Sequence, residues 1–184
     1  MRRVAVCDYR AGNIRSVAVA LRRLGADVEI TRAPEAVTRA ELAVLPGVGS
    51  ARAAMAALRE DGLDEALRAR VADGRPTLGI CLGLQLALEE SEEDGGVPGL
   101  GLVAGRARRL RGERVPRLGW AQVDPLGEAF YFAHSYAAET PAVTATSEGV
   151  VAEVRAGSFL GVQFHPEKSG PAGARYLERC LSPA

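Results

Sequence analysis

The first eighty residues alternate between short apolar runs and segments of helical periodicity. Strands are expected at 2–9, 27–31 and 42–45, followed by an apolar run that ends at Cys81. The helices expected between them span 14–24, 34–39, a segment capped by Ser50 that reaches Glu60, and 63–71. Strands alternating with helices predict a parallel sheet with crossover helices on its faces. Ligands of such sheets bind beyond the carboxyl ends of the strands.

The second half of the chain has a different pattern. Short strand-like runs are separated by turn signals, at 100–110, 119–123, 129–133, 142–146, 150–155 and 158–164. An amphipathic helix is expected at 172–181 to close the chain. Neither a linker nor an internal repeat divides the sequence. We therefore expect one domain over 1–184, a three-layer α/β fold with a mostly parallel central sheet and an added antiparallel portion.

Charge and cysteine content narrow the class of protein. The 184 residues have a formal net charge of zero, which argues against a nucleic-acid or anionic-membrane partner held by bulk electrostatics. The basic stretch 106–117 is interpreted as a solvated edge. Three widely spaced cysteines suggest neither a disulfide framework nor a zinc site, and no cofactor or other metal is indicated. Without a signal-peptide pattern or an apolar run of about 20 residues, we expect a cytoplasmic protein.

The run that ends at Cys81 carries the first chemical signal. Gly79 and Gly83 bracket the cysteine, and a helix is expected directly afterwards, over 84–90. Gly-x-Cys-x-Gly at a strand-to-helix turn is the layout of a nucleophile elbow with Cys in place of Ser. The amino end of a helix favours a thiolate and any oxyanion formed beside it. A structural buried cysteine is the competing interpretation of this stretch alone.

A thiol nucleophile needs a general base, and only His134 and His165 offer an imidazole. His165 ends the last predicted strand, where the reactive edge of the sheet is expected. Pro166 favours an extended conformation for its predecessor, so that Glu167 is able to reach back to the imidazole. We therefore predict a Cys81–His165–Glu167 triad. Its chain order differs from the Ser–Asp–His order of α/β-hydrolases, which disfavours that fold.

An acyl intermediate also needs donors for its oxyanion. The amide of Leu82, next to the nucleophile, is one expected donor. A second is expected from the glycine-rich loop after the third strand, at Val48 or Gly49, because glycines let a peptide present its N–H inward.

Three motifs together resemble the class I glutamine amidotransferase domain: 79–85 around Cys81, 163–167 around His165, and the loop 46–49. The resemblance covers nearly the whole chain. It implies hydrolysis of glutamine through a thioester on Cys81, with ammonia released to a synthase partner. It further implies that Gly47, Gln85 and the backbone of Ser135 and Tyr136 bind the glutamine.

Finer features resemble one branch of that family, the glutaminase subunits of imidazole glycerol phosphate synthase. They are the stretches 8–17, 134–136 and 165–169. The resemblance implies a separate (β/α)₈ cyclase subunit as partner, in histidine biosynthesis. Lys168, the only lysine, is expected at the partner interface together with Asn13 and Trp120.

The sequence also departs from the family pattern. Arg10 or Ala11 stands where the family usually has glycine, and Arg117 and Ala121 replace a histidine and an asparagine. We expect these departures to affect docking rather than the triad. Three alternatives remain: a glutaminase subunit for anthranilate, aminodeoxychorismate or pyridoxal phosphate synthesis, a stand-alone cysteine hydrolase, and a silent binding subunit.

Overall fold

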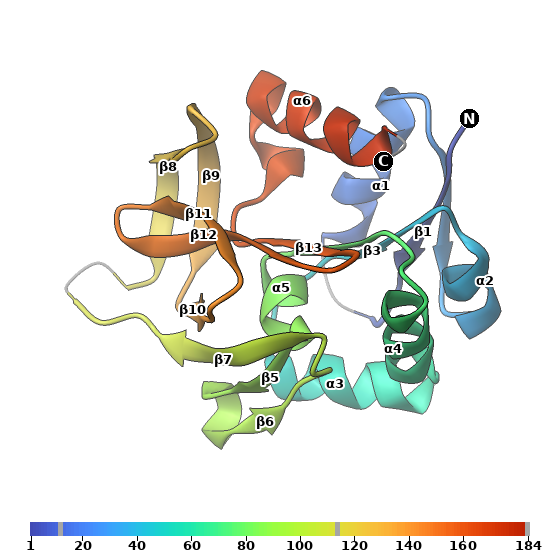
Figure 1. Cartoon of the computed structure of the whole chain (residues 1–184), viewed down its shortest axis with the longest axis horizontal. Coiled ribbons are helices and arrows are strands. Elements are labelled where there is room, and N and C mark those ends of the chain that lie inside the picture. Colours follow the sequence, from blue (N-terminus) through green and yellow to red (C-terminus); the bar gives the residue numbers. More distant parts are fainter. Residues whose placement is uncertain (11–12, 113–114, 183–184) are drawn as a thin grey trace.

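The computed structural model describes residues 1–10, 13–112 and 115–182, and is organised around a seven-stranded sheet (Figure 1). The strand order is β11–β12–β13–β4–β3–β1–β2. Five strands run parallel: β1 (Arg3–Cys7), β2 (Asp27–Thr31), β3 (Leu42–Leu45), β4 (Thr77–Ile80) and β13 (Phe159–Val162). β12 (Val150–Ala156) and β11 (Val143–Ser147) extend this sheet in antiparallel fashion.

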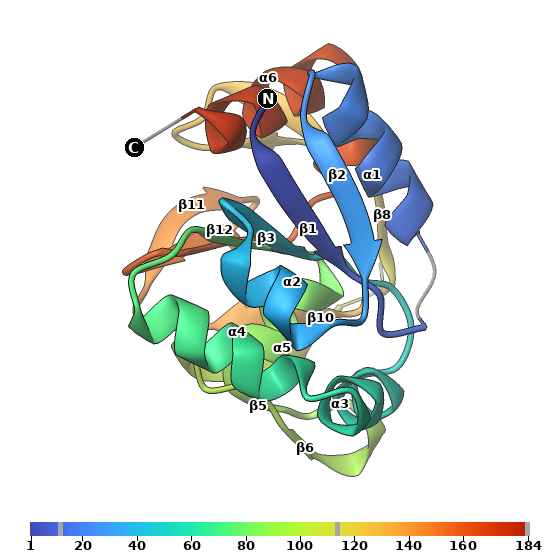
Figure 2. The ribbon, with the colours of Figure 1, turned by 90° about the vertical axis from the view of Figure 1, so that its right-hand side faces the viewer.

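Helices cover both faces of the sheet (Figures 1 and 2). α1 (Ile14–Arg23) and α6 (Gly170–Leu181) pack on the face of Val4 and Val6, whereas α2 (Pro34–Arg39), α3 (Ala51–Glu60) and α4 (Leu63–Ala72) pack on the face of Ala5 and Cys7. Successive residues of β1 thus enter opposite cores, which explains why its sequence is continuously apolar. The predicted three-layer α/β fold is confirmed.

The second half adds two smaller sheets. One has the order β10–β7–β5–β6 and is formed by β10 (Tyr136–Glu139), β7 (Val103–Arg109), β5 (Leu88–Ser91) and β6 (Val97–Pro98). The other is the antiparallel pair β8 (Arg117–Val123) and β9 (Glu128–His134). Phe130 and Phe132 of β9 join the core beneath α1 and α6. Strands β6 and β10 were not predicted.

The helix expected over 84–90 was wrong at both ends. α5 spans Leu82–Ala87, and the chain then enters β5. The Leu88 and Glu89 carbonyl oxygens accept hydrogen bonds from the amides of Gly101 and Gly99, at 3.0 and 2.8 Å. These long-range partners replace the next helical turn, and tertiary contacts therefore override the local helical periodicity.

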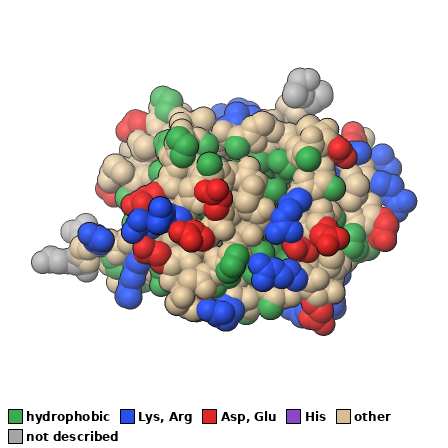
Figure 3. Space-filling view, turned by 60° about the horizontal axis from the view of Figure 1, so that its bottom comes forward, with side chains coloured by type: hydrophobic (Ala, Val, Ile, Leu, Met, Phe, Trp, Pro, Cys, Tyr) green, Lys and Arg blue, Asp and Glu red, His purple; other side chains and the backbone are tan. Residues whose placement is uncertain are grey.

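The basic stretch pairs with acids on neighbouring strands. Arg106 lies 3.4 Å from Glu90, and Arg108 lies 3.0 Å from Glu92 and 2.7 Å from Glu139. The face shown in Figure 3 accordingly carries acidic and basic side chains interspersed. Within the described ranges, no helix is long and apolar enough to cross a membrane.

Candidate active site

Cys81 lies at the turn from β4 to α5, at the carboxyl edge of the sheet. Its backbone has φ 51° and ψ −106°, in the left-handed half of conformational space that non-glycine residues rarely occupy. The turn is also tightly packed, because a Cβ added at Gly83 would lie 1.8 Å from the carbonyl oxygen of Leu45. The sheet therefore holds the cysteine in the sharp, strained turn that the motif predicted.

Two hydrogen bonds link the Cys81 thiol to residues other than His165. The Gln163 Nε2 donates to Sγ at 3.5 Å, and the Ala133 carbonyl oxygen lies 3.9 Å from Sγ. Cys81 is only 5% exposed, and that exposure opens into a pocket of about 210 Å³. The amide of Leu82 begins α5, so it has no acceptor within the helix and remains available to a ligand.

His165 and Glu167 form a buried pair after β13. The His165 Nδ1 lies 2.9 Å from the Glu167 Oε1, and the two side chains are 1% and 0% exposed. Burial alone would lower the pKa of His165, but the Cys81 thiol and the Glu167 carboxylate raise it to about 9. The other imidazole nitrogen, Nε2, is buried without a hydrogen bond of standard geometry. It is therefore free to exchange a proton with the neighbouring thiol.

The backbone after β13 fixes this pair. His165 is extended, at φ −104° and ψ 91°, and the short helical turn Pro166–Lys168 returns Glu167 to its imidazole. The His165 amide donates to the Tyr131 carbonyl at 2.9 Å, and the Ser169 hydroxyl donates to the His165 carbonyl at 2.7 Å. The predicted effect of Pro166 on its predecessor is thus found in the structure.

Asn13 reaches the same carboxylate from the opposite end of the chain. Its Nδ2 donates to the Glu167 Oε1, although the two residues are 154 positions apart. The assignment of Asn13 to the partner interface stays a prediction, and within the chain its side chain contacts Glu167, the partner of His165. Asn13 has φ 71°, a conformation that asparagine tolerates better than most residues.

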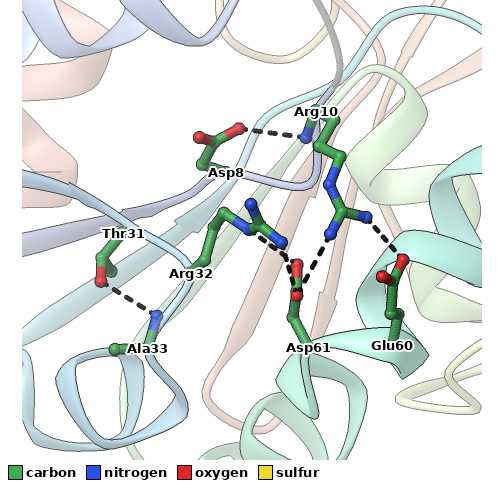
Figure 4. A network of polar contacts seen from close by, with 7 residues as sticks. All are labelled: Asp8, Arg10, Thr31, Arg32, Ala33, Glu60 and Asp61. Carbon is green, nitrogen blue, oxygen red and sulfur yellow. Dashed lines mark hydrogen bonds and ion pairs between the residues drawn. The ribbon is translucent and has the colours of Figure 1, made fainter.

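An ion-pair network surrounds Arg10, which lies a few residues after the end of β1 (Figure 4). Arg10 contacts Glu60 at 2.8 Å and Asp61 at 3.4 Å, and Arg32 contacts Asp61 at 2.8 Å. The hydrogen bond from Arg32 lowers the pKa of Asp61. Arg10 has φ 63°, in the left-handed region that favours glycine. The neighbouring Ala11 and Gly12 lie outside the described residues.

The pocket beside Cys81 contains most of the residues expected to bind substrate. Its wall includes Val48, Gly49, Leu82, Gln85, Ser135 and Tyr136. The Gln85 Nε2 donates to the Tyr136 carbonyl at 2.8 Å and to the Gln163 Oε1 at 3.1 Å, which ties two walls of the pocket together. Gly47 is not part of this wall and packs behind it, against Tyr9 and Leu82.

The second histidine, His134, lines the pocket and has different neighbours from those of His165. The His134 Nδ1 lies 2.8 Å from the Tyr136 carbonyl oxygen. Burial, together with the charge of Arg117, lowers the pKa of His134 to about 4. His134 is therefore neutral near pH 7, and its Nδ1–H is the donor to Tyr136.

The three residues expected at the partner interface divide into two groups. Trp120 is 58% exposed on β8, beside Leu118 at 65%, and Lys168 is also exposed, whereas Asn13 points to Glu167. The two β8 departures, Arg117 and Ala121, alternate with this exposed pair and face inward. Among the residues that the structure describes, no group of three His, Cys, Asp or Glu could hold a metal ion.

Two contacts of the site were not predicted. Gln163 is completely buried and touches both Cys81 and Gln85, and a polar residue at the end of an apolar strand was its signal in the sequence. Tyr9 is 2% exposed and donates through its hydroxyl to the Pro46 carbonyl, at the start of the glycine-rich loop. No feature of the sequence around Tyr9 indicated that contact.

Comparison of the sequence with known proteins identifies the family of this chain. The family model described as glutamine amidotransferase class-I matches residues 5–183. The imidazole glycerol phosphate synthase subunit HisH of Methanothermobacter thermautotrophicus is 45% identical over 190 residues, covering 95% of each chain. The subunit of the same name from Moorella thermoacetica is 44% identical over 196 residues, covering 97% of this chain and 93% of its own.

Solved structures share the fold at lower identity. A crystal structure of a glutamine amidotransferase superposes with a TM-score of 0.80 at 24% identity, covering 97% of both chains. A chain of the PurLQS structure from Thermotoga maritima superposes with a TM-score of 0.76 at 17% identity, covering 98% of both.

Proposed function

We propose, from the premise that this chain belongs to the class I glutamine amidotransferase family, that it is the glutaminase subunit of an imidazole glycerol phosphate synthase. It would hydrolyse L-glutamine to glutamate and ammonia and pass the ammonia to a cyclase subunit. The observation that carries the proposal is the buried His165–Glu167 pair beside the thiol of the strained Cys81. The HisH relatives, which match over almost their full length, supply the biosynthetic context.

The first half of the reaction is acyl transfer to sulfur. With the thiol proton transferred to the His165 Nε2, the Cys81 thiolate attacks the side-chain amide carbon of glutamine. The raised pKa of His165 favours the imidazolium that this transfer forms, and the Glu167 carboxylate stabilises the positive charge. The imidazolium then donates its proton to the leaving nitrogen, which departs as ammonia and leaves a γ-glutamyl thioester on Cys81.

The second half returns the enzyme to its starting state. Water attacks the thioester while His165 accepts a proton from it, and glutamate leaves as the thiol is reprotonated. In both halves a negative charge develops on the former amide oxygen. The Leu82 amide and an amide of Val48 or Gly49 are the proposed donors to it, because all three residues border the pocket.

The pocket also suggests how glutamine is oriented. Gln85 and the backbone of Ser135 and Tyr136 lie on its wall, and we assign them to the glutamine head group. Gly47 contributes by letting the loop approach Leu82, since a Cβ at Gly47 would lie 2.8 Å from the Leu82 Cβ. No metal or cofactor takes part in the proposed reaction.

The partner would be a (β/α)₈ cyclase subunit, which joins the ammonia to its nucleotide and forms imidazole glycerol phosphate and aminoimidazole carboxamide ribotide. The exposed side chains of Leu118 and Trp120 lie on the strand next to the pocket, and Leu118 also borders it. Lys168 follows the pair formed by His165 and Glu167 and is exposed. We assign Leu118 and Trp120 to the partner interface because large exposed apolar side chains mark protein contacts, and we keep Lys168 there as the sequence predicted.

The test is a glutaminase assay with and without the cyclase subunit and its nucleotide. We expect slow hydrolysis by this chain alone and strong activation in the complex. The Cys81→Ser variant should lose glutamine-dependent synthesis and keep synthesis from free ammonia. Equal glutamine turnover with and without the partner would favour a stand-alone hydrolase, and activation by a different synthase would favour another acceptor. Loss of ammonia-dependent synthesis in Cys81→Ser would mean that Cys81 is structural.

A further inference from the structure

The loop between β3 and α3, residues 46–50, is held at its first end by Tyr9. The Tyr9 hydroxyl donates to the Pro46 carbonyl, and both residues are buried. Burial raises the pKa of the Tyr9 phenol far above its usual range, so it remains a donor. A Cβ at Gly47 would lie 2.2 Å from the Tyr9 hydroxyl oxygen. Pro46 and Gly47 are therefore packed against Tyr9.

The second end of the loop is held by a turn from a distant part of the chain, Glu93–Gly95. The Asp94 Oδ2 accepts from the Ser50 hydroxyl at 2.6 Å and from the Arg52 amide at 3.1 Å. The Glu93 Oε2 accepts from the Ala51 amide at 3.0 Å, and the Arg52 guanidinium donates to the Asp94 carbonyl at 2.5 Å. Four bonds thus fix the start of α3.

Between these ends lie Val48 and Gly49. Val48 is half-buried, Gly49 is exposed with φ 107°, and both border the pocket opposite Leu82. A glycine at that φ can reverse the direction of its peptide at little steric cost. Motion of the loop is therefore easiest at the two residues that are the proposed oxyanion donors.

We propose that Tyr9 and Asp94 are positioning residues that hold the two ends of the 46–50 loop, so that only the peptides of Val48 and Gly49 turn toward the oxyanion. This inference rests on the proposed function, because it assigns the loop to the thioester chemistry. Fixed ends limit the loop to a small set of arrangements, one of which places an N–H in the oxyanion hole. Such preorganised donors act most strongly where charge develops in the transition state.

The test removes one of the two anchoring residues. It then measures the glutamine-dependent reaction and the ammonia-dependent synthesis separately. Asp94 has φ 55°, so Asp94→Gly deletes the acceptor without backbone strain, and Asp94→Asn keeps an oxygen that accepts from Ser50. Glu92→Gln is the matched control, because the Glu92 carboxylate is exposed, stands two residues before Asp94, and bonds to Arg108 and Arg109 instead of to the loop.

In the complex with the cyclase subunit, Asp94→Gly should lower kcat for glutamine about 10-fold, a part of the 10²–10³-fold loss that follows deletion of an oxyanion donor. KM for glutamine and the rate of synthesis from ammonia should stay within about two-fold of wild type. That ratio corresponds to a change in free energy of less than about 0.5 kcal/mol. Asp94→Asn should retain most of kcat, and Glu92→Gln all of it. Tyr9→Phe should reproduce the loss of kcat from the other end of the loop.

Three results would overturn the inference: wild-type kcat in Asp94→Gly, an equal fall in ammonia-dependent synthesis, or identical losses in Asp94→Gly and Asp94→Asn. Each would mean that the turn has only a structural role or none. Failure of the proposed function has a different signature, because Cys81→Ser would then keep its glutamine-dependent activity. The inference would fall with it, whatever the Asp94 variants show.

Discussion

Two buried histidines, one just after β13 and one at the end of β9, have surroundings with opposite effects on their pKa values. His165 follows β13 and is 1% exposed, and His134 ends β9 and is 5% exposed. The pKa of His165 is raised to about 9, whereas that of His134 is lowered to about 4. Burial favours the neutral imidazole in both cases, so it does not explain the difference.

The difference lies in the charge beside each ring. Glu167 and the Cys81 thiol adjoin His165, and Arg117 adjoins His134, its partner across the β8–β9 pair. Arg117 stands at one of the departures from the family pattern and places its guanidinium 4.3 Å from the Phe132 ring centroid. Of two histidines that the sequence offered as bases, the one with a carboxylate partner is therefore suited to proton transfer, and the other to holding the Tyr136 backbone.

Replacing each histidine by asparagine should give the largest difference between the two strand ends. His165→Asn should lower glutamine hydrolysis by the complex roughly 10²–10⁴-fold, the usual contribution of a general acid–base. His134→Asn should cost less than about 10-fold, because its amide can still donate to Tyr136 and a neutral hydrogen bond contributes about 1 kcal/mol. The measurement is glutamate release, with ammonia-dependent synthesis as the control for assembly. Similar losses of activity in the two variants would contradict the different roles assigned to His165 and His134.

The proximity of Cys81, His165 and Glu167 could be predicted because these residues belong to short motifs at strand ends. Cys81 and His165 each follow an apolar strand, and parallel strands bring their carboxyl ends to one edge. The first strands were likewise visible, since burial on both faces gives a continuous apolar run. By contrast, β5 is defined by β6 and β7, which come later in the chain, and its sequence alone fits a helix.

The pH dependence of the free energy of unfolding should reflect the pKa shifts of both histidines. A folded pKa of about 9 for His165 stabilises the protein fully below the unfolded value near 6.5, and this contribution is lost as pH rises through 9. The low pKa of His134 has the opposite sign, since its contribution is present above 6.5 and is lost as pH falls through 4. Each shift corresponds to roughly 3 kcal/mol. The free energy of unfolding should therefore be greatest near pH 6.5.

Denaturant titrations between pH 5 and 8.5 check this expectation. In His165→Asn the decline above pH 6.5 should disappear, and in His134→Asn the decline below pH 6.5 should be reduced. A wild-type profile that is flat from pH 6.5 to 8.5 would mean that Glu167 and Cys81 do not hold the proton on His165.

A further prediction concerns Asn13, whose contact with Glu167 was not predicted from the sequence. Its contact with Glu167 spans 154 residues and depends on a turn at φ 71°, which no local pattern encodes. Asn13→Gly keeps that backbone conformation and removes the amide that orients the carboxylate. Asn13 orients the carboxylate of Glu167 much as outer-shell residues orient metal ligands, and loss of such residues lowers affinity or activity about 10–100-fold. We expect the lower end of that range, about a 10-fold fall in kcat. The pKa of His165, followed by NMR, should fall, while that of His134 remains about 4. If the pKa of His165 is unchanged and the cyclase subunit binds more weakly, the result would instead support a place for Asn13 at the partner interface, as the sequence predicted.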